Sequence, residues 1–351
     1  IADHDLLLSS GEQPGVLVRT LKRATDTDAL IRVRERLDAI LARYLEASLP
    51  IDFVAQVATA VTDQITRRAI QLAIEGLGAP PVPFACLALG SQGRGEQVLR
   101  TDQDNALVFE DGSYQDYFLQ LGTDVVDRLE MVGFERCPAE MMASNPKWCG
   151  TLNHWRQVFS RWIETPEPRS LLHANIFFDF RCVYGSTENT EALREHVFGS
   201  VEREGLFLPA LANGALHNPA PLSFFRGFVV ERNGEHRNEF DLKARAMMPL
   251  ADAARVLSLE LGIREVNTID RFRAAAKADE SLSETCRGAA AAYSVLMEIR
   301  THEGKRRGDS GRYVDIQSAG AFDRQRLRQA FSALNRVQQM LTVRYQTDLL
   351  R

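Results

Sequence analysis

The sequence lacks several features that mark particular classes of protein. No run approaches the ~18 consecutive apolar residues of a membrane span, and no signal peptide opens the chain, so it predicts a cytoplasmic protein without membrane contact. The five cysteines are odd in number, lie far apart and form no C-x-x-C pair, which argues against a disulfide framework and a structural zinc site. A net charge of −5 provides no general basic face, so nucleic acid is not an expected partner.

The composition is that of an ordinary globular protein, with 45% hydrophobic and 25% charged residues. At 351 residues the chain exceeds the size of one core, and two or three packed units are expected. Its opening, I-A-D-H-D-L-L, resembles the closing segment of a CBS regulatory domain. Residues 1–8 are therefore expected to be the tail of such a domain in a longer protein.

Apolar residues at helical spacing predict two amphipathic helices near the N-terminus, over about 30–45 and 54–72. Glycines and prolines then end this pattern, so residues 1–78 are predicted to form an N-terminal helical segment. Helical spacing returns in the last third of the chain and predicts a C-terminal helical bundle over 221–351. Residues 187–220, rich in glycine and proline, are predicted to connect this bundle to the middle of the chain.

Short apolar strands separated by helices characterise the middle of the chain. Residues 84–89 (F-A-C-L-A-L) have the pattern of a buried strand entering a turn, and 106–109 follow as a second strand. Residues 176–182 alternate apolar and polar side chains, which predicts a third strand. The predicted fold is therefore α+β, with a small mixed-sheet domain over 79–186 flanked by the two helical regions.

An aromatic stripe lies within this domain, directly after the sequence S-N-P at residues 144–146. The pattern predicts one capped helix whose aromatic face packs in the core, rather than a platform for stacking bases. Its members are Trp148, Leu152, Trp155, Phe159 and Trp162.

Three glycines follow the strand 84–89 in the sequence G-S-Q-G-R-G-E-Q (residues 90–97). Glycines free backbone N–H groups to turn toward an anion, and a short helix starting there would add its positive end. The sequence lacks the G-K-[ST] of a Walker A loop, and the glycine spacing does not fit a Rossmann fingerprint. It therefore predicts a phosphate-binding turn of another type.

Two carboxylates follow in T-D-Q-D-N (residues 101–105), which leads into the strand 106–109. Asp102 and Asp104 are two residues apart on extended backbone, so they point to the same face and can coordinate one or two hard cations. Alone, the pair would suit a turn or cap equally well, but the glycine turn and the strand favour a metal site. Metals held in this way neutralise polyphosphate and activate an attacking oxygen, which predicts Mg²⁺ or Mn²⁺ as cofactor.

These motifs resemble those of a known superfamily. L-G-S (residues 89–91), with D-x-D beginning eleven residues after the serine, is similar to the h-G-[GS]…D-x-D pattern of the DNA polymerase β-like nucleotidyltransferases. The longer string over 90–108 is closer to one branch, the bacterial signalling nucleotidyltransferases related to PII-protein uridylyltransferases and often fused to CBS and cyclic-nucleotide-binding domains. The likeness continues through M-A-S-N-P-K-W (142–148), F-F-D-F-R (177–181) and F-D-L-K-A-R (240–245).

The resemblance implies a role for each matching residue. Catalytic and metal-binding roles fall to three carboxylates, Asp102, Asp104 and Asp179. Nucleotide-binding roles fall to six residues, Gly90, Ser91, Arg94, Thr101, Arg181 and Lys243. Asp179 and Arg181 would share the polar face of the predicted strand 176–182, and a structural ion pair at a sheet edge is the alternative for them. An ordinary exposed lysine is the alternative for Lys243.

The predicted function is transfer of a nucleoside monophosphate from an NTP, either ATP or UTP, to a hydroxyl of a protein or small molecule with release of pyrophosphate. The family relation implies uridylylation of a PII-like protein, and adenylylation fits the residues equally well. The alternative is a nucleotide-sensing regulatory module of a CBS-containing signalling protein, which has the fold and transfers nothing. The intact carboxylate pair and Gly-Ser turn favour the enzyme, and a homodimer is compatible with both.

Overall fold

The structure is a computed structural model, and the residues that it describes are 14–217, 236, 239–315 and 319–347. The predicted CBS tail, residues 1–8, lies outside them. The chain divides into two compact units, residues 1–156 with 180–193 and residues 157–179 with 194–351. Two helices, α7 (Leu152–Glu164) and α9 (Thr187–Arg203), run across this division. Within the described ranges, none of the helices has both the length and the apolar character needed to cross a membrane.

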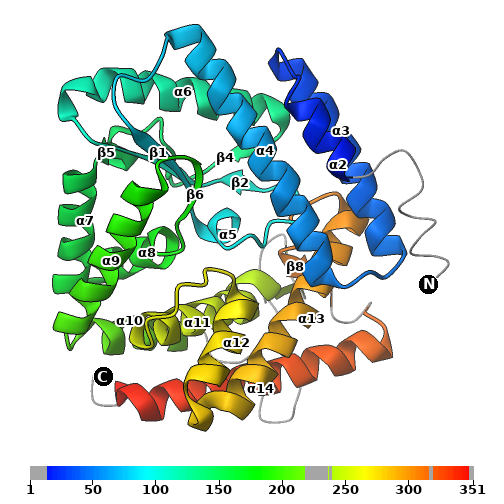
Figure 1. The fold of residues 1–351 in the computed structure, drawn as a ribbon. Coiled ribbons are helices and arrows are strands. Elements are labelled where there is room, and N and C mark those ends of the chain that lie inside the picture. Colours follow the sequence, from blue (N-terminus) through cyan, green and yellow to red (C-terminus); the bar gives the residue numbers. More distant parts are fainter. Residues whose placement is uncertain (1–13, 218–235, 237–238, 316–318, 348–351) are drawn as a thin grey trace. The chain divides into compact units, whose positions relative to one another are not determined.

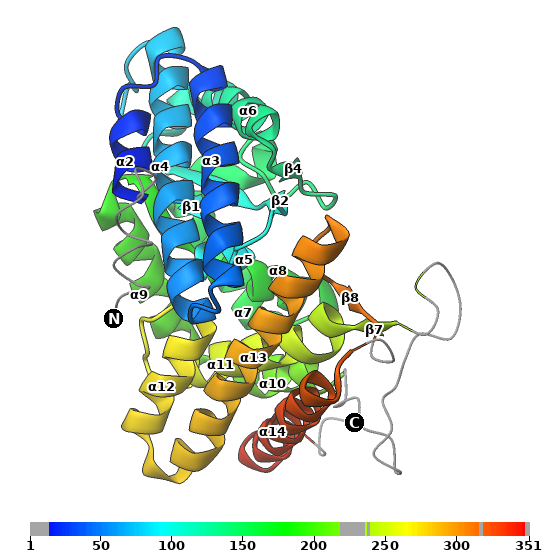
Figure 2. The ribbon, with the colours of Figure 1, turned by 90° about the vertical axis from the view of Figure 1, so that its right-hand side faces the viewer.

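From residue 14 onward, the first unit has three helices that pack side by side, as Figure 2 shows. They are α2 (Pro14–Leu21), α3 (Thr27–Glu46) and α4 (Ile51–Leu77). Asp26 caps α3, because its carboxylate accepts a hydrogen bond of 2.8 Å from the amide of Ala29. Gly78 ends α4 with a φ of 93°. The two helices predicted near the N-terminus are therefore confirmed as α3 and α4.

A four-stranded mixed sheet forms the centre of the first unit, in the order β5-β3-β1-β6. Figure 1 labels β5, β1 and β6 of this sheet. Its strands are β1 (Phe84–Ala88), β3 (Asn105–Phe109), β5 (Cys149–Thr151) and β6 (Arg181–Gly185). The central strand β1 is antiparallel to both neighbours, whereas β5 runs parallel to β3. Every residue of β1 and β3 is buried, which explains why β1 is apolar throughout and β3 is apolar after Asn105.

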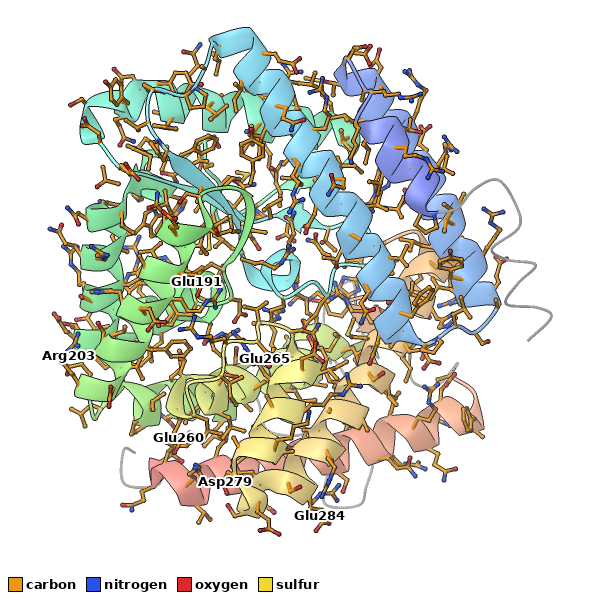
Figure 3. All side chains as sticks on the ribbon, in the orientation of Figure 1. Glu191, Arg203, Glu260, Glu265, Asp279 and Glu284 are labelled. Carbon is orange, nitrogen blue, oxygen red and sulfur yellow. The ribbon has the colours of Figure 1, made fainter. Side chains whose placement is uncertain are left out.

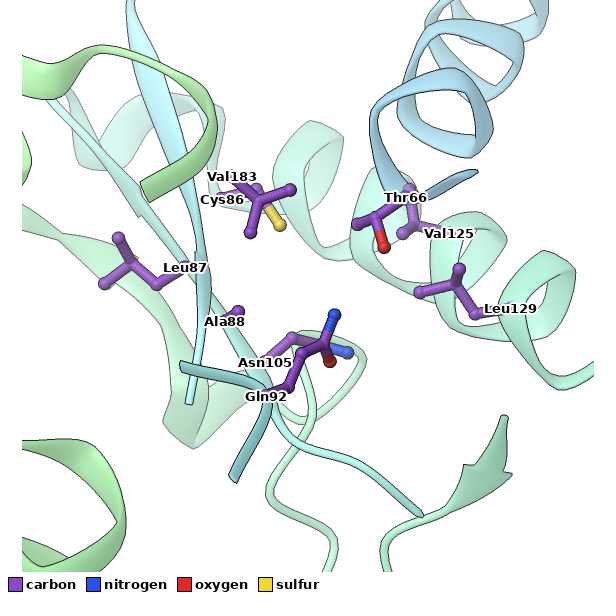
Figure 4. A pocket seen from close by; sticks show the side chains of 9 residues that line it. All are labelled: Thr66, Cys86, Leu87, Ala88, Gln92, Asn105, Val125, Leu129 and Val183. Atoms are coloured by element: carbon purple, nitrogen blue, oxygen red, sulfur yellow. The ribbon is translucent and has the colours of Figure 1, made fainter. Parts of the chain in front are cut away.

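Helices α4 and α6 (Gln115–Val132) pack on the sheet and leave a small cavity of about 10 Å³ beneath them (Figure 4). Thr66 of α4 and Leu129 of α6 line it opposite Cys86 of β1. The Thr66 hydroxyl is buried and has no hydrogen-bond partner among the described residues. Elsewhere α6 approaches its neighbours closely, since a Cβ on Gly122 would lie 2.4 Å from the carbonyl oxygen of Ala143.

The second unit is a helical bundle. Its elements are α8 (Pro168–Phe177), α10 (Phe207–Leu216), β7 (Phe240–Asp241), the π-helical turn η3 (Lys243–Met247), α11 (Met248–Glu260), α12 (Thr268–Ala278), η4 (Glu280–Leu282), α13 (Ser283–Arg307), β8 (Tyr313–Val314) and α14 (Ala321–Tyr345). Helix α13 packs against both α12 and α14. Arg344 joins three helices by pairing with Glu260 at 2.8 Å and Asp279 at 3.1 Å, the two acidic residues labelled near each other in Figure 3.

The predicted α+β fold with a small mixed sheet and flanking helices is confirmed. The predicted connection over 187–220 contains α9 and α10, and α10 packs against α11 and α14. The aromatic stripe does not lie on one helix as predicted. Asn145 caps a short 3₁₀ helix, η2 (Pro146–Trp148), and β5 follows before α7 begins. The four aromatic side chains of the stripe are nevertheless buried.

The strand predicted over 176–182 is wrong in its first half. Ile176 and Phe177 close α8, and the strand β6 begins only at Arg181. Pro168 starts α8 at a position where proline suits a helix, and this helix takes up the apolar residues that suggested a strand. Short apolar runs fit a strand and the end of a helix equally well, so alternation alone could not decide.

Candidate functional site

The glycine-rich turn follows β1 as a single helical turn, α5 (Gly90–Gly93). Its backbone closes on itself, with the amide of Gly93 donating to the carbonyl of Leu89 at 2.8 Å. Gly90 has a φ of 52° and Gly95 a φ of 67°, both in the left-handed region that disfavours other residues. The backbone conformation therefore favours glycine at the first position of the turn and at position 95, two residues beyond its end.

Arg181 supports this turn from β6. Its Nε donates to the carbonyl oxygen of Gly93 and its Nη2 to that of Gln92, both at 3.2 Å. The same guanidinium forms a bidentate pair with Asp63 of α4, with distances of 2.5 and 2.9 Å. Because most of its donors face the turn and Asp63, Arg181 fixes the turn against α4. A direct contact of Arg181 with phosphate stays a prediction.

The carboxylate pair lies directly beside the turn. Asp102 belongs to β2 (Asp102–Gln103), and Asp104 lies between β2 and β3. The amide of Leu89 donates to the carbonyl oxygen of Asp104 at 3.0 Å, and the side-chain amide of Gln97 donates to that of Asp102 at 2.8 Å. Both acids are half-buried. The backbone of Leu89, at the start of the turn, thus holds the backbone of Asp104, and the side chain of Gln97 holds that of Asp102.

Two buried amides determine which way the acids face. Gln103 is 1% exposed and donates to the carbonyl of Val126, within α6, and to that of Phe134, just after α6. Asn105 is 5% exposed, donates to the Gln103 side chain at 3.1 Å and accepts the amide of Ala143 at 2.8 Å. Since alternate residues of extended backbone face opposite sides, inward amides at 103 and 105 turn the acids at 102 and 104 outward.

Cys137 joins the two acids to form a third corner of the site. Strand β4 (Glu135–Arg136) pairs in parallel with β2, with Asp102 level with Glu135. Continuing this register places Asp104 beside Cys137. One ligand atom from each of Asp102, Asp104 and Cys137 lies within 4.8 Å of the others. Two carboxylates fit the oxygen preference of Mg²⁺ or Mn²⁺, so the donor set suits the predicted cofactor.

The thiol of Cys137 is protonated in this arrangement. Burial, the charge of Asp104 and a hydrogen bond to that carboxylate raise the pKa of Cys137 to about 11. The thiol therefore acts as a hydrogen-bond donor to Asp104 at neutral pH. The sequence did not reveal this residue, because β4 contains only two residues and gives no periodic signal.

The other residues predicted for the phosphate site lie around the turn. Arg94 pairs with Glu96 at 2.7 Å, and the Glu96 side chain is 2% exposed. Ser91 is half-buried, and the Thr101 hydroxyl is buried without a hydrogen-bond partner among the described residues. The structure thus brings Gly90, Ser91, Arg94 and Thr101 into the same unit as the acids, and their contacts with nucleotide stay predictions.

Asp179 belongs to the second unit and is completely buried there. Its carboxylate accepts hydrogen bonds from Arg255 at 2.9 and 2.6 Å and from Arg271 at 2.6 Å. Both arginines are themselves buried, and Arg255 also pairs with Asp252 at 2.7 Å. Asp179 therefore has structural ion-pair partners, and its role as third metal ligand stays a prediction.

Lys243 also lies in the second unit, at the start of the π-helical turn η3. Asp241 precedes it, accepts the amide of Ala244 at 2.8 Å and pairs with Arg312 at 2.7 Å. Segments of π-helix are rare and are found frequently at functional sites. A nucleotide contact of Lys243 stays a prediction.

A glycine turn after the first strand of a small mixed sheet, with a carboxylate pair leading into the next strand, defines a nucleotidyltransferase-type domain. Comparison with known families gives the same class: residues 35–169 match "Putative nucleotidyltransferase DUF294" and residues 205–345 match "Putative nucleotidyltransferase substrate binding domain". The chain therefore belongs to the DUF294 nucleotidyltransferase family. No curated protein matches it.

Proposed function

We propose that the chain is a divalent-metal-dependent nucleotidyltransferase, which transfers a nucleoside monophosphate from an NTP to a hydroxyl of a protein or small molecule. The observation that carries the proposal is the hydrogen bond between Leu89 and Asp104, which joins the glycine turn to the carboxylate pair. In the reaction, the acceptor oxygen forms a bond to the α-phosphorus. The bond from that phosphorus to the oxygen bridging to the β-phosphate breaks, and pyrophosphate leaves while the acceptor proton passes to solvent.

Each part of the site has one task in this reaction. Gly90 and Ser91 bind the terminal phosphates through the turn, and Arg181 with Asp63 keeps the turn in place. Asp102 and Asp104 would hold the divalent ion, whose charge would neutralise the triphosphate and favour deprotonation of the acceptor hydroxyl. The buried Gln103 and Asn105 keep both carboxylates outward. The second unit would bind the acceptor, as the description of its matched family states for a substrate.

One observation favours a different function, a nucleotide-sensing module that transfers nothing. Arg94 and Arg181, which were predicted to meet the phosphates, pair with Glu96 and Asp63. Fewer cations then remain to stabilise charge on the transferring phosphoryl group, while the glycine turn could still bind nucleotide. The experiment below compares ATP with UTP and so also tests which base the site accepts.

The experiment combines nucleotide binding with transfer. Calorimetry with ATP and UTP, each with and without Mg²⁺ or Mn²⁺, measures whether binding requires the ion. Incubation with each α-labelled NTP then measures labelling of the chain or an added acceptor together with pyrophosphate release. Asp102→Asn and Asp104→Asn test the pair, and Asp116→Asn is the matched control, because Asp116 is an exposed carboxylate of the same unit.

We expect metal-dependent binding and pyrophosphate release, both reduced at least about 100-fold in the two site variants and unchanged in the control. Metal-dependent binding of nucleotide without turnover would support the sensing module. Nucleotide binding that needs neither the ion nor the carboxylate pair would contradict both functions at this site.

A further inference from the structure

The sulfur of Cys137 gives the carboxylate cluster a ligand of different chemistry. Mg²⁺ takes oxygen ligands and retains several waters, so it makes no use of a thiol. Zn²⁺, Co²⁺ and Cd²⁺ accept thiolate together with carboxylate. Both kinds of ion can therefore bind the carboxylates of Asp102 and Asp104, but only the thiophilic ions also bind the sulfur of Cys137.

The spacing of the three side chains suits one tetrahedral ion. Zinc holds sulfur at about 2.3 Å and carboxylate oxygen at about 2.0–2.2 Å, so its ligand atoms lie roughly 3.3–3.6 Å apart. The ligand atoms of Asp102, Asp104 and Cys137 already lie within 4.8 Å of one another. Small side-chain rotations would close the set, and three protein ligands leave one position for water or a nucleotide oxygen.

The backbone around Cys137 holds its sulfur close to the carboxylates. The carbonyl oxygen of Cys137 accepts a hydrogen bond of 2.9 Å from the amide of Glu140, which fixes the turn that follows the cysteine. Such outer contacts orient a metal ligand. The hydrogen bond of the amide of Asn105 to the carbonyl of Met141, at 3.1 Å, ties this segment to the strand that follows the acids. The sulfur is thus fixed beside the carboxylates by the fold.

We propose that Asp102, Asp104 and Cys137 form an oxygen–sulfur site that binds thiophilic divalent cations, such as Zn²⁺, Co²⁺ and Cd²⁺, in competition with Mg²⁺. On binding, the metal–sulfur bond forms, the S–H bond breaks and the proton passes to solvent. The proposal rests on the carboxylate pair of the proposed function but not on transfer. Its consequence is that such ions compete with Mg²⁺ for the two carboxylates.

The experiment titrates the metal-free protein with Cd²⁺ and follows the ultraviolet sulfur-to-metal charge-transfer absorption, without nucleotide. We expect a band that saturates at one equivalent and is absent with Mg²⁺ alone. Cys137→Ser should abolish it, and Asp104→Asn should weaken the apparent affinity at least about tenfold. Cys182→Ser is the matched control, because Cys182 is a half-buried thiol of the same unit, and it should leave the band unchanged.

A second measurement on the unaltered protein avoids dependence on a variant that folds poorly. Cd²⁺ should protect Cys137, and not Cys182, from alkylation mapped by mass spectrometry. Absence of the band, a band retained in Cys137→Ser, or protection of Cys182 alone would overturn the proposal. If nucleotide binding still needs the carboxylate pair in that case, only the sulfur ligand is refuted. A cysteine-dependent band together with carboxylate-independent nucleotide binding would instead refute the proposed function.

Discussion

Replacing Asp179 by asparagine tests whether this buried carboxylate holds the second unit together. Its side chain is 0% exposed and accepts three hydrogen bonds from Arg255 and Arg271, which are 1% and 4% exposed. Asp179→Asn keeps the size of the side chain but removes the charge that compensates two buried guanidinium groups. Breaking a buried pair by removing one partner costs about 3–5 kcal/mol.

That loss is a large fraction of the ~5–15 kcal/mol by which folded proteins are stable. Urea unfolding followed by circular dichroism measures it, since the midpoint falls with the free energy of unfolding. Asp270→Asn is the control, because Asp270 forms an exposed pair with Arg273 at 3.1 Å and should change stability by less than about 1 kcal/mol. A loss below about 1 kcal/mol in Asp179→Asn would refute the reasoning. Normal stability with lost metal binding would instead identify Asp179 as a metal ligand.

Three further tests use four substitutions. Gly122→Ala should lower the free energy of unfolding by about 1–3 kcal/mol or more, since the new Cβ would lie 2.4 Å from the Ala143 carbonyl oxygen. Gly214→Ala has open space in α10 and should raise it by about 0.5–1 kcal/mol. Thermal unfolding compares the two variants. Arg181→Lys keeps the charge but loses the planar guanidinium that holds the glycine turn. Calorimetry should show that the variant binds nucleotide about tenfold more weakly and still binds Cd²⁺. Equal nucleotide affinity in the variant and the unaltered protein would contradict the support role. Burial above all raises the pKa of Cys86 to about 12, so the folded state favours the neutral thiol. The resulting contribution to the free energy of unfolding is complete at neutral pH and is lost as the pH rises above about 9. Denaturant titrations should therefore show that the free energy of unfolding falls less steeply at alkaline pH in Cys86→Ala.

The long helices and the central strands could be predicted because their signals are local. Helices α3 and α4 span 20 and 27 residues, enough for the helical spacing of apolar residues to be unmistakable. Strand β1 is wholly apolar, β3 is apolar after its first residue, and turn residues bound both strands. The glycine turn and the carboxylate pair were also visible, because each depends on spacing within a few residues.

The remaining features depend on contacts between distant residues. Asp179 looked like a residue of an alternating strand, and its partners Arg255 and Arg271 lie 76 and 92 residues further along the chain. Cys137 reaches Asp104 only because two-residue strands pair in parallel, and strands so short have no pattern of their own. The buried amides Gln103 and Asn105 could have been found, since D-Q-D-N alternates as a strand with one inward face would.

The inward hydrogen bonds of Gln103 and Asn105 affect how the metal site forms during folding. A slip of this segment by one residue would exchange the two faces, burying both carboxylates and exposing both amides. Such a register would leave charges in the core and unpaired carbonyls around α6, so folding itself rejects it. The ligands are consequently preorganised before any ion arrives, and the entropy of ordering them is lost during folding rather than during binding.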